Sequence, residues 1–554
     1  MSRPGSRRGS RRLSQPTSGG VPMFYFELDT SDCPEAHDNE TIAREPSPST
    51  DIMQASGPPA RFPSLSVPQA PRPMITEYAP GRKGNARSEF SDLALSKFKC
   101  KENGVSVAVT NGSTTPLVEN PIEDEEAGTY DPFKHRHLEH PTTDLDTLIH
   151  LLKGSLGTGI LSMPLAFKNA GLFFGLIATF TIGFICTYCV HVLVKCAHEL
   201  CRRTRVPSLD FADVAETAFS CGPPAVQKFS RLARAVINTF LVIDLLGCCC
   251  VYLVFVATNL QQVINHYTGS EMSVQMYMLA MIAVLIPLNL IRNLKYLSPF
   301  SMVANLLIGT GMAITFYYVL TDVPAVTERP YFSSWPQLPL FFGTAIFALE
   351  GIGVVMPLEN NMKTPTHFIG CPGVLNTGMS IVVSLYALVG FFGYLKYGEL
   401  TAGSITLNLP QDPLAQSVKV MIALAIFLTY ALQFYVPMEI IRKGFIDVHL
   451  RKYPVASEYV LRVALVLLTV GIAIAIPHLG PFISLVGAVC LSTLGLMFPA
   501  VIEIVTFWDT PGGLGAFNWK VYKNVAIVAF GLLGFVTGTY VSIQEFVEEF
   551  SKHS

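Results

Sequence analysis

The sequence has few charged residues: only 14% of its 554 residues are Asp, Glu, Lys or Arg, whereas half are apolar and the mean hydropathy is +0.41. This composition is that of a protein that crosses a membrane several times. No group of Cys and His residues has metal-ligand spacing, so we expect no metal site. A P-loop and a catalytic triad are also missing. We therefore predict neither ATP-driven transport nor an enzyme, and no cofactor or nucleic acid partner.

Long apolar runs are abundant. Eleven mostly apolar windows have about the length, roughly 17 to 25 residues, that a helix needs to cross the hydrocarbon. They are residues 148–167, 172–197, 235–260, 274–291, 299–320, 338–358, 374–395, 414–436, 460–476, 482–504 and 525–543. We therefore predict an all-α polytopic membrane protein of eleven transmembrane helices, with helices one to five in residues 144–320, helices six to ten in 321–505, and helix eleven with a short tail in 506–554.

Lys and Arg residues are divided unevenly between the two sides. With the N-terminus in the cytosol, the inner loops hold fifteen of them and the outer side five. This difference predicts a cytoplasmic N-terminus and an extracellular or lumenal C-terminus. The outer loops then contain no cysteine, which excludes disulfides there. Lys195, Lys419 and Glu503 lie near span ends, and we expect their head groups to reach the membrane interface.

Residues 1–143 are rich in Ser, Pro, Gly and Arg without a sustained period, which predicts a disordered cytoplasmic tail. No apolar segment follows its basic start, so we expect no cleavable signal peptide. Ser10 and Ser14 each follow an arginine pair, which fits a basophilic kinase or an anionic membrane surface; a merely solvated tail is the alternative. The sequence YFEL at 25–28 is a candidate signal for a trafficking adaptor.

Glycines interrupt the first span. Gly154, Gly157 and Gly159 lie within the stretch HLLKGSLGTGILSMPLAFKNAG, and each costs about 1 kcal/mol in a helix relative to alanine. Unwound backbone in hydrocarbon is tolerated only where it lines a cavity, binds a ligand or is buried in protein. The alternative is close packing of helices through the small residues Ser155 and Gly159.

The sixth span is interrupted in the same way, since Glu350 is followed by Gly351 and Gly353. Two broken spans five helices apart, one running outward and one inward, are typical of a transporter built from inverted repeats. We therefore predict a LeuT-like inverted five-helix repeat with discontinuous helices one and six, plus one C-terminal helix.

The two breaks predict a site for a zwitterion. Unwinding of Gly154 to Gly159 would free backbone N–H groups at the start of the outer half-helix to hold a carboxylate, and freed carbonyls with Glu350 would receive an ammonium group. Glycines on both walls favour a substrate with a small side chain, and Phe347 is placed to cover the pocket. The predicted substrate-binding residues are Gly154, Ser155, Gly157, Thr158, Gly159, Phe347, Glu350, Gly351 and Gly353.

Proton coupling is predicted for His150, Asp244 and Glu350 because charges inside a membrane are costly and need a function or a partner. His150 lies one turn before Gly154, and histidine is the residue type best suited to exchange protons in the physiological pH range; alternatively, His150 is hydrogen-bonded between helices. Glu350 either contacts the substrate or neutralises Lys153. Asp244 either relays protons or hydrogen-bonds neighbouring backbone.

The stretches TLIHLLKGSLGTGILSMPLAFKNAG, VKCAHELCRR, CCVYLVFVATNLQQVI and FFGTAIFALEGIGVVMPLENNMKTP resemble the proton-coupled amino acid transporters of the amino acid/auxin permease superfamily, especially insect members. The resemblance covers residues 129–545. It implies symport of small neutral amino acids such as glycine, alanine and proline with protons, with the proton gradient as driving force. It also implies a pH-sensing role for His150 and matches His198 to the histidine of the KCAH motif.

Two residues depart from the pattern of this family: Ser155 stands where asparagine is common, and Asp244 where a neutral polar residue is usual. The resemblance places the protein in the plasma membrane or the lysosomal membrane. Two other hypotheses remain open. One is an amino acid receptor that signals with little flux, and the other is a sodium-coupled carrier of the same fold.

Overall fold

The computed structural model describes residues 130–136, 138, 141–155, 157–269, 271–292, 298–349, 351–446 and 453–553. All of them belong to one compact unit, residues 86–554. Regular structure in this part of the chain is helical, with no strand and one isolated bridge between Thr142 and Met362. Ser10, Ser14, the YFEL sequence and Glu350 lie outside the described residues, so the predictions for them remain predictions.

Nine helical segments of the described chain are long and apolar enough to cross a membrane. They comprise α4 (Leu172–Thr204), α7 (Ser230–Thr268), α9 (Ser298–Leu320), α10 with α11 (Leu338–Leu349 and Ile352–Asn360), α12 (Val374–Tyr397), α13 (Pro413–Ile441), α15 (Pro454–Ala475), α16 with the π-helical η10 and α17 (Leu479–Val486, Gly487–Met497 and Phe498–Phe507), and α18 (Trp519–His553). The protein is therefore a multi-pass membrane protein.

The two remaining predicted spans are present as other apolar helices. Residues 148–167 fall on the interrupted pair α2 (Asp144–Ser155) and α3 (Thr158–Ala170), and residues 274–291 fall on the shorter helix α8 (Val274–Asn289). Eleven transmembrane helices remain a prediction, because α2, α3 and α8 are each shorter than a full span.

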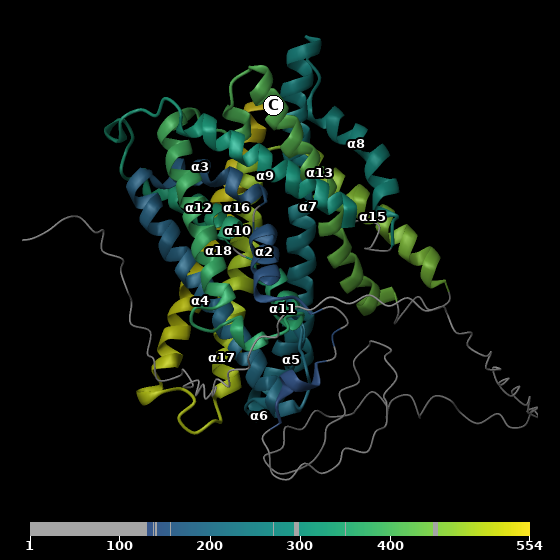
Figure 1. Cartoon of the computed structure of the whole chain (residues 1–554), viewed down its shortest axis with the longest axis vertical. Helices are drawn as coiled ribbons and strands as arrows, with labels where there is room; N and C mark the ends of the chain where they lie inside the picture. The colour runs from purple at the N-terminus through teal and green to yellow at the C-terminus, as the bar shows by residue number, and fades with distance from the viewer. Residues whose placement is uncertain are drawn as a thin grey trace, which may run out of the picture. The chain divides into compact units, whose positions relative to one another are not determined.

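The broken spans lie within the bundle. α3 packs against α10 and α12, and α10 packs against α16 and η10 as well (Figure 1). α13 runs beside α7 and α9. Fully buried aromatic side chains fill the interior, among them Phe167, Phe255, Tyr386 and Tyr430. The large hydrophobic side chains that remain exposed, such as Phe184 on α4 and Leu533 on α18, are suited to contact lipid.

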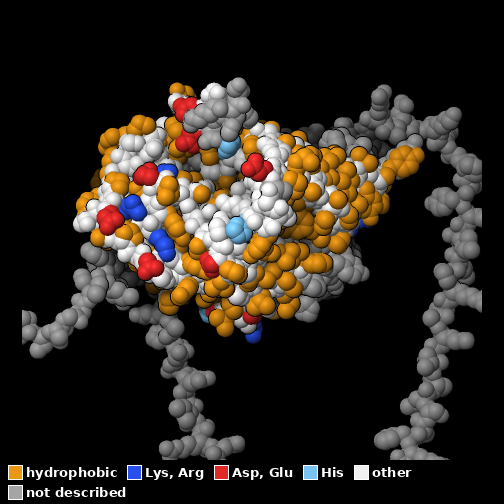
Figure 2. Space-filling model, turned by 90° about the horizontal axis from the view of Figure 1, so that it is seen from above, with side chains coloured by type: hydrophobic (Ala, Val, Ile, Leu, Met, Phe, Trp, Pro, Cys, Tyr) orange, Lys and Arg blue, Asp and Glu red, His pale blue; other side chains and the backbone are white. Residues whose placement is uncertain are grey.

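The two ends of the bundle hold different charged residues. The inner end holds Arg136, His198 and Glu359 and is the end predicted to face the cytosol, whereas the outer end holds Lys168 and Lys396. Figure 2 shows the outer end, where charged side chains are scattered and hydrophobic ones cover large parts of the rim.

Two helices at the inner end were not predicted. α5 (Phe211–Cys221) and the short α6 (Pro224–Gln227) lie in the connection between α4 and α7, and α5 packs against α7 and α17 (Figure 1). α5 buries Phe211, Val214, Ala215 and Ala218, which recur at helical spacing on one face. With only eleven residues, α5 is too short to span the membrane, and we interpret it as an amphipathic helix packed against the inner end.

Candidate functional site

The first span is broken inside the glycine run, as predicted. α2 ends at Ser155 and α3 begins at Thr158, and Gly157 between them has φ −130° and ψ −147°, outside the helical region. The backbone N–H of Gly157 donates to the carbonyl of Ser155 at 3.0 Å, and the hydroxyl of Tyr386 on α12 donates to the same carbonyl. A side chain from another helix therefore satisfies backbone that the break has freed.

The sixth span is also discontinuous. α10 ends at Leu349 and α11 begins at Ile352, with Gly351 at φ −132° and ψ 20° before the first turn. The N–H of Val354 donates to the carbonyl of Gly351 at 3.0 Å. Discontinuous helices one and six are therefore confirmed, while Glu350 lies outside the described residues.

Both breaks are narrower than the sequence predicted. Gly154 is the penultimate residue of α2, Gly159 is the second residue of α3, and Gly353 is the second residue of α11. The expectation that the chain is unwound from Gly154 to Gly159 is therefore wrong. Glycine lowers the preference for a helix, but neighbouring helical residues and tertiary packing hold these three glycines in helical geometry.

The breaks lie against each other. A Cβ placed on Gly351 would be 3.9 Å from the hydroxyl oxygen of Ser155, and one placed on Gly154 would be 3.5 Å from a methyl carbon of Val354. A Cβ on Gly159 would be 2.7 Å from the Cα of Ala348, so only glycine allows α3 and α10 to approach this closely. The glycine run thus serves close packing at Gly159 as well as the break at Gly157, and both interpretations of the first span are correct in part.

Two tyrosines that the sequence did not indicate border the first break. Tyr386 binds the Ser155 carbonyl, and the hydroxyl of Tyr252 on α7 is 3.9 Å from where a Cβ on Gly157 would lie. A signal was present, because a tyrosine in the middle of an apolar span has a hydroxyl that needs a partner, whereas membrane tyrosines usually lie at the interfaces. Tyr252 and Tyr386 therefore join the candidate site.

The inner half-helices leave one face uncovered. On α2, Asp146, Ile149, His150, Lys153 and Gly154 form an exposed stripe at helical spacing. The opposite face of α2 is buried, with Leu151 packed against Gly378 of α12.

The exposed face of α11 contains Gly353, Val354 and Pro357, and Val354 adjoins Gly154. The two exposed stripes therefore meet next to the breaks. His150 and Lys153 lie on this accessible surface rather than in an enclosed interior.

Asp244 and Phe347 are less closely tied to the breaks. Asp244 on α7 is 7% exposed, and its Oδ1 has no hydrogen-bond partner among the described residues. It precedes Tyr252 by eight residues, or roughly 12 Å along a helix, and so lies toward the inner end from the first break. Phe347 is buried on α10, with its Cβ close to Gly487 of η10. Proton coupling by Asp244 and substrate binding by Phe347 remain predictions.

Two charged residues expected to reach the interface are buried instead. Glu503 on α17 accepts hydrogen bonds from Lys523 at 2.7 Å and Asn524 at 2.8 Å, both on α18. Lys419 on α13 is fully buried, and its Nζ has no partner in the described part of the chain. Position near a span end was a poor guide, because other helices and loops cover these ends.

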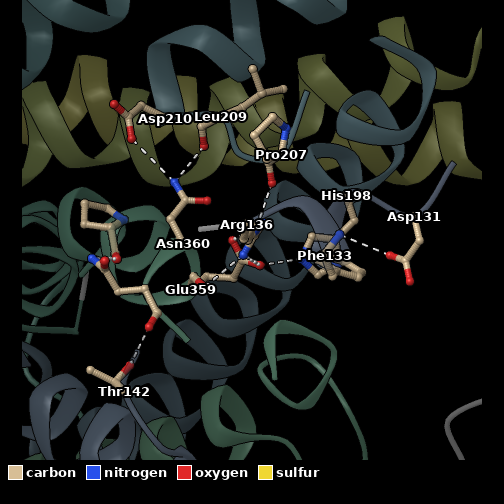
Figure 3. Close-up of polar contacts among 12 residues, drawn as sticks. Asp131, Phe133, Arg136, Thr142, His198, Pro207, Leu209, Asp210, Glu359 and Asn360 are labelled. Carbon is tan, nitrogen blue, oxygen red and sulfur yellow. Dashed lines mark hydrogen bonds and ion pairs between the residues drawn. The ribbon is translucent and has the colours of Figure 1, made fainter. Parts of the chain in front are cut away.

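A charged cluster lies at the inner end (Figure 3). The Glu359 carboxylate, 0% exposed at the end of α11, lies 3.0 Å from Nη1 of Arg136 and 2.8 Å from Nε2 of His198 on α4. Arg136 also donates to the carbonyl of Pro207 at 2.7 Å. We call Arg136, His198 and Glu359 the inner latch. The KCAH motif had drawn attention to His198, whereas Arg136 and Glu359 were missed because their pairing depends on the fold.

A second set of contacts fastens the start of α2 to the segment after α11. Asp144 accepts hydrogen bonds from Nδ1 of His367 at 2.8 Å and from the hydroxyl of Thr364 at 2.9 Å. The His367 hydrogen bond is the main reason why the pKa of Asp144 lies below its usual value. The N–H of Thr142 donates to the carbonyl of Asn361 at 2.9 Å. The inner ends of both broken spans are thus tied to each other.

Comparison with known proteins gives the family. Residues 140–544 match the model of the family described as transmembrane amino acid transporter protein. The chain belongs to the transmembrane amino acid transporter family. This is a family of transporters, so the prediction that the protein is not an enzyme is confirmed, and amino acids are the substrates that the family implies.

Two relatives and two solved structures are similar to the chain. The Drosophila melanogaster "Proton-coupled amino acid transporter-like protein pathetic" is 49% identical over 425 residues, 76% of this chain and 89% of its own. The Caenorhabditis elegans "Probable amino acid transporter skat-1" is 26% identical over 422 residues, 74% and 91% of the two chains. The predicted resemblance to insect transporters is therefore confirmed.

The solved structures are more distant. Mhp1, a nucleobase–cation symporter in a closed conformation with bromovinylhydantoin bound, has 14% identity and a TM-score of 0.45, covering 76% of this chain and 94% of its own. MhsT in complex with L-phenylalanine has 14% identity and a TM-score of 0.40, covering 73% and 97%.

Proposed function

We propose that the protein is a proton-coupled symporter of small neutral amino acids that carries substrate and proton into the cytosol by alternating access. The observation that carries this proposal is the pair of facing breaks, in which Gly351 of the sixth span adjoins Ser155 of the first. Membership of an amino acid transporter family supports the substrate class, and the name of the Drosophila relative supports proton coupling.

The substrate would bind across the two breaks. The N-terminus of α3 presents the N–H groups of Thr158 and Gly159, which suit a carboxylate, and the C-terminal end of α10 offers carbonyls and Glu350 to an ammonium group. The approach of Gly159 to Ala348 leaves little room beside the substrate, which favours small side chains. Tyr252 and Tyr386 would line the opposite wall.

The proton would be handled on the inner side of the breaks. His150 lies on the exposed stripe of α2, one turn before Gly154, so a proton released there has access to the inner end. The second candidate is Asp244, which is buried and has one carboxylate oxygen without a hydrogen-bond partner among the described residues. The inner latch supports alternating access, because its contacts tie α11 and the segment before α2 to α4 and can be broken and remade as a unit.

The test is uptake of radiolabelled glycine, alanine and proline into proteoliposomes with an imposed pH gradient. With the membrane potential clamped at zero, we expect accumulation of about tenfold per pH unit at most for one proton per neutral substrate, and its loss when a protonophore removes the gradient. Replacing sodium with choline should leave uptake intact. Binding without gradient-dependent accumulation would contradict the proposal and favour a receptor, whereas uptake that stops without sodium would favour a sodium-coupled carrier.

A further inference from the structure

Lys419 is a buried lysine that has no hydrogen-bond partner in the described part of the chain. It lies on α13 with a side-chain exposure of 0%, and its Nζ meets no hydrogen-bond acceptor among the described residues. Lys396, at the end of α12, provides the contrast: its Nζ donates to the carbonyls of Tyr318 and Thr321, as expected of a structural lysine. A buried amine needs a partner, and no described residue supplies one to Lys419 by a direct hydrogen bond.

Polar atoms on the same face of α13 lead from Lys419 to the outer end. Asp412, Gln416 and Lys419 are spaced i, i+4 and i+7, so their side chains share one face over roughly 10 Å of helix. Asp412 Oδ1 and Gln416 Oε1 are each buried without a hydrogen-bond partner in the described chain.

Other elements complete this polar region. Gln262 on α7 donates to the carbonyl of Leu407, just before α13, and its Oε1 is another buried oxygen without a described partner. The Tyr318 hydroxyl on α9 donates to Asp412 Oδ2. The described elements at this end carry several titratable or charged groups, which include Asp412, Tyr317 and Tyr318 (α9), His266 and Tyr267 (α7), Tyr277 (α8), Lys396 and Tyr397 (α12), Lys168 (α3), Arg329 and Glu399.

Water is the ligand that fits this arrangement. The orphaned atoms are one amine, which donates, and several oxygens, which accept, and ordered water can satisfy both kinds at once. An anion would be repelled by Asp412, and a metal cation by a charged Lys419. The partly exposed Asp412 opens the row of polar groups toward the outer end.

We propose that Lys419 binds a proton delivered from the outer solution through ordered water along Asp412 and Gln416, and that loading and release of this proton accompany the transport cycle. The amine lone pair takes the proton from hydronium, leaving water, and returns it to water when it is released. Opening and closing of this region would change the access of the amine to water, and so determine when the proton is loaded and when it is released. This inference rests on the proposed function.

The test compares Lys419→Met, Lys419→Arg and the control Lys396→Met in proteoliposomes, with initial uptake measured from neutral to mildly acidic external pH. Arginine keeps the positive charge but does not lose its proton, so it separates a proton-binding group from a fixed structural charge. We expect wild type and Lys396→Met to take up more substrate as the outside is acidified. Both Lys419 variants should lose this dependence.

Each outcome decides between the proposal and a structural role. If Lys419→Arg or Lys419→Met keeps the wild-type pH profile, Lys419 is not a proton-binding group. If Lys419→Met does not reconstitute, Lys419→Gln takes its place, because glutamine keeps a polar contact with water. A wild-type protein that transports without any response to the pH gradient would overturn the proposed function and this inference together, whereas a normal wild-type response with unaltered variants overturns this inference alone.

Discussion

In the outer halves of the two broken spans, α3 and α10, nearly every residue is buried, whereas the inner halves, α2 and α11, each leave one stripe exposed. The outer halves are held by close apolar packing, with Gly159 against Ala348. The inner halves bury one apolar face, which includes Leu151 and Ile352, and polar contacts tie their far ends, where Arg136 and His198 surround Glu359 and Asp144 binds His367.

This difference indicates which part of the site moves. Apolar packing at atomic contact does not loosen gradually, because small displacements forfeit the attraction and expose surface. A polar latch is more readily exchanged, since water can replace each of its hydrogen bonds when it opens. We therefore infer that the outer halves α3 and α10 stay packed against each other. The inner halves α2 and α11 would move apart when the inner latch breaks and come together when it forms again.

The largest effect is expected where the outer halves touch. Gly159→Ala would place a Cβ 2.7 Å from the backbone of Ala348, so α3 and α10 must separate, at a cost of about 1 to 3 kcal/mol of folding stability and with loss of transport. The matched variant Gly154→Ala places its Cβ 3.5 Å from Val354, an ordinary contact, and alanine favours the helix by about 1 kcal/mol. Thermal unfolding of both purified variants measures the difference.

Equal thermal stability of the two alanine variants would contradict the distinction between the packed outer half and the open inner half. Only the thermal stabilities of the two variants are compared, because Gly154 belongs to the predicted binding site and its substitution can change transport directly. Gly159→Ala should also reach the membrane in smaller amounts, which quantitative blotting of the purified membranes measures.

The next largest effect is expected at the inner latch. Arg136→Ala leaves the buried Glu359 with only His198, and removing one partner of a buried ion pair costs about 3 to 5 kcal/mol, less any relaxation that lets water reach Glu359. We expect lower thermal stability and faster alkylation of a cysteine introduced at Val354, because the inner stripes open. Adding Glu359→Gln removes the stranded charge and should restore much of the stability.

The double variant is the control for this prediction. If Arg136→Ala and the double variant are equally unstable, the loss comes from Arg136 contacts such as that to the Pro207 carbonyl rather than from the uncompensated carboxylate. If neither variant changes the rate at which the cysteine introduced at Val354 is alkylated, the inner latch does not control access to the inner stripes.

The sequence predicted the features that depend on local composition. Hydropathy identified the spans, and the glycine run around Gly157, with Gly351 in the sixth span, located both breaks. The sequence overestimated the length of the breaks, because helix propensity is a weak preference that packing overrides, as at Gly159. α5 was missed because its apolar face of eleven residues is too short to register as a span.

Features that depend on distant contacts were beyond the sequence. Arg136 and Glu359 lie 223 positions apart, and neither position alone indicates a pair. Lys419 and Glu503 were expected at the interface from their distance to span ends, but α18 covers Glu503, and Lys419 faces the interior of the bundle. Tyr386 carried a signal in its hydroxyl, but not the identity of the carbonyl that it binds.

The smallest effect on stability, and a specific effect on coupling, is expected for His150→Ala. Because His150 lies on the exposed stripe of α2, its removal should change the unfolding free energy by less than about 0.5 kcal/mol. If it releases protons toward the inner end, the dependence of uptake on pH should shift or disappear at unchanged expression. His266→Ala, an exposed histidine at the outer end of α7, is the control and should keep the wild-type profile. A His150→Ala protein with normal pH dependence would remove His150 from the mechanism and leave Asp244 as the candidate on the inner side, while the comparison between enclosed outer and accessible inner halves would stand.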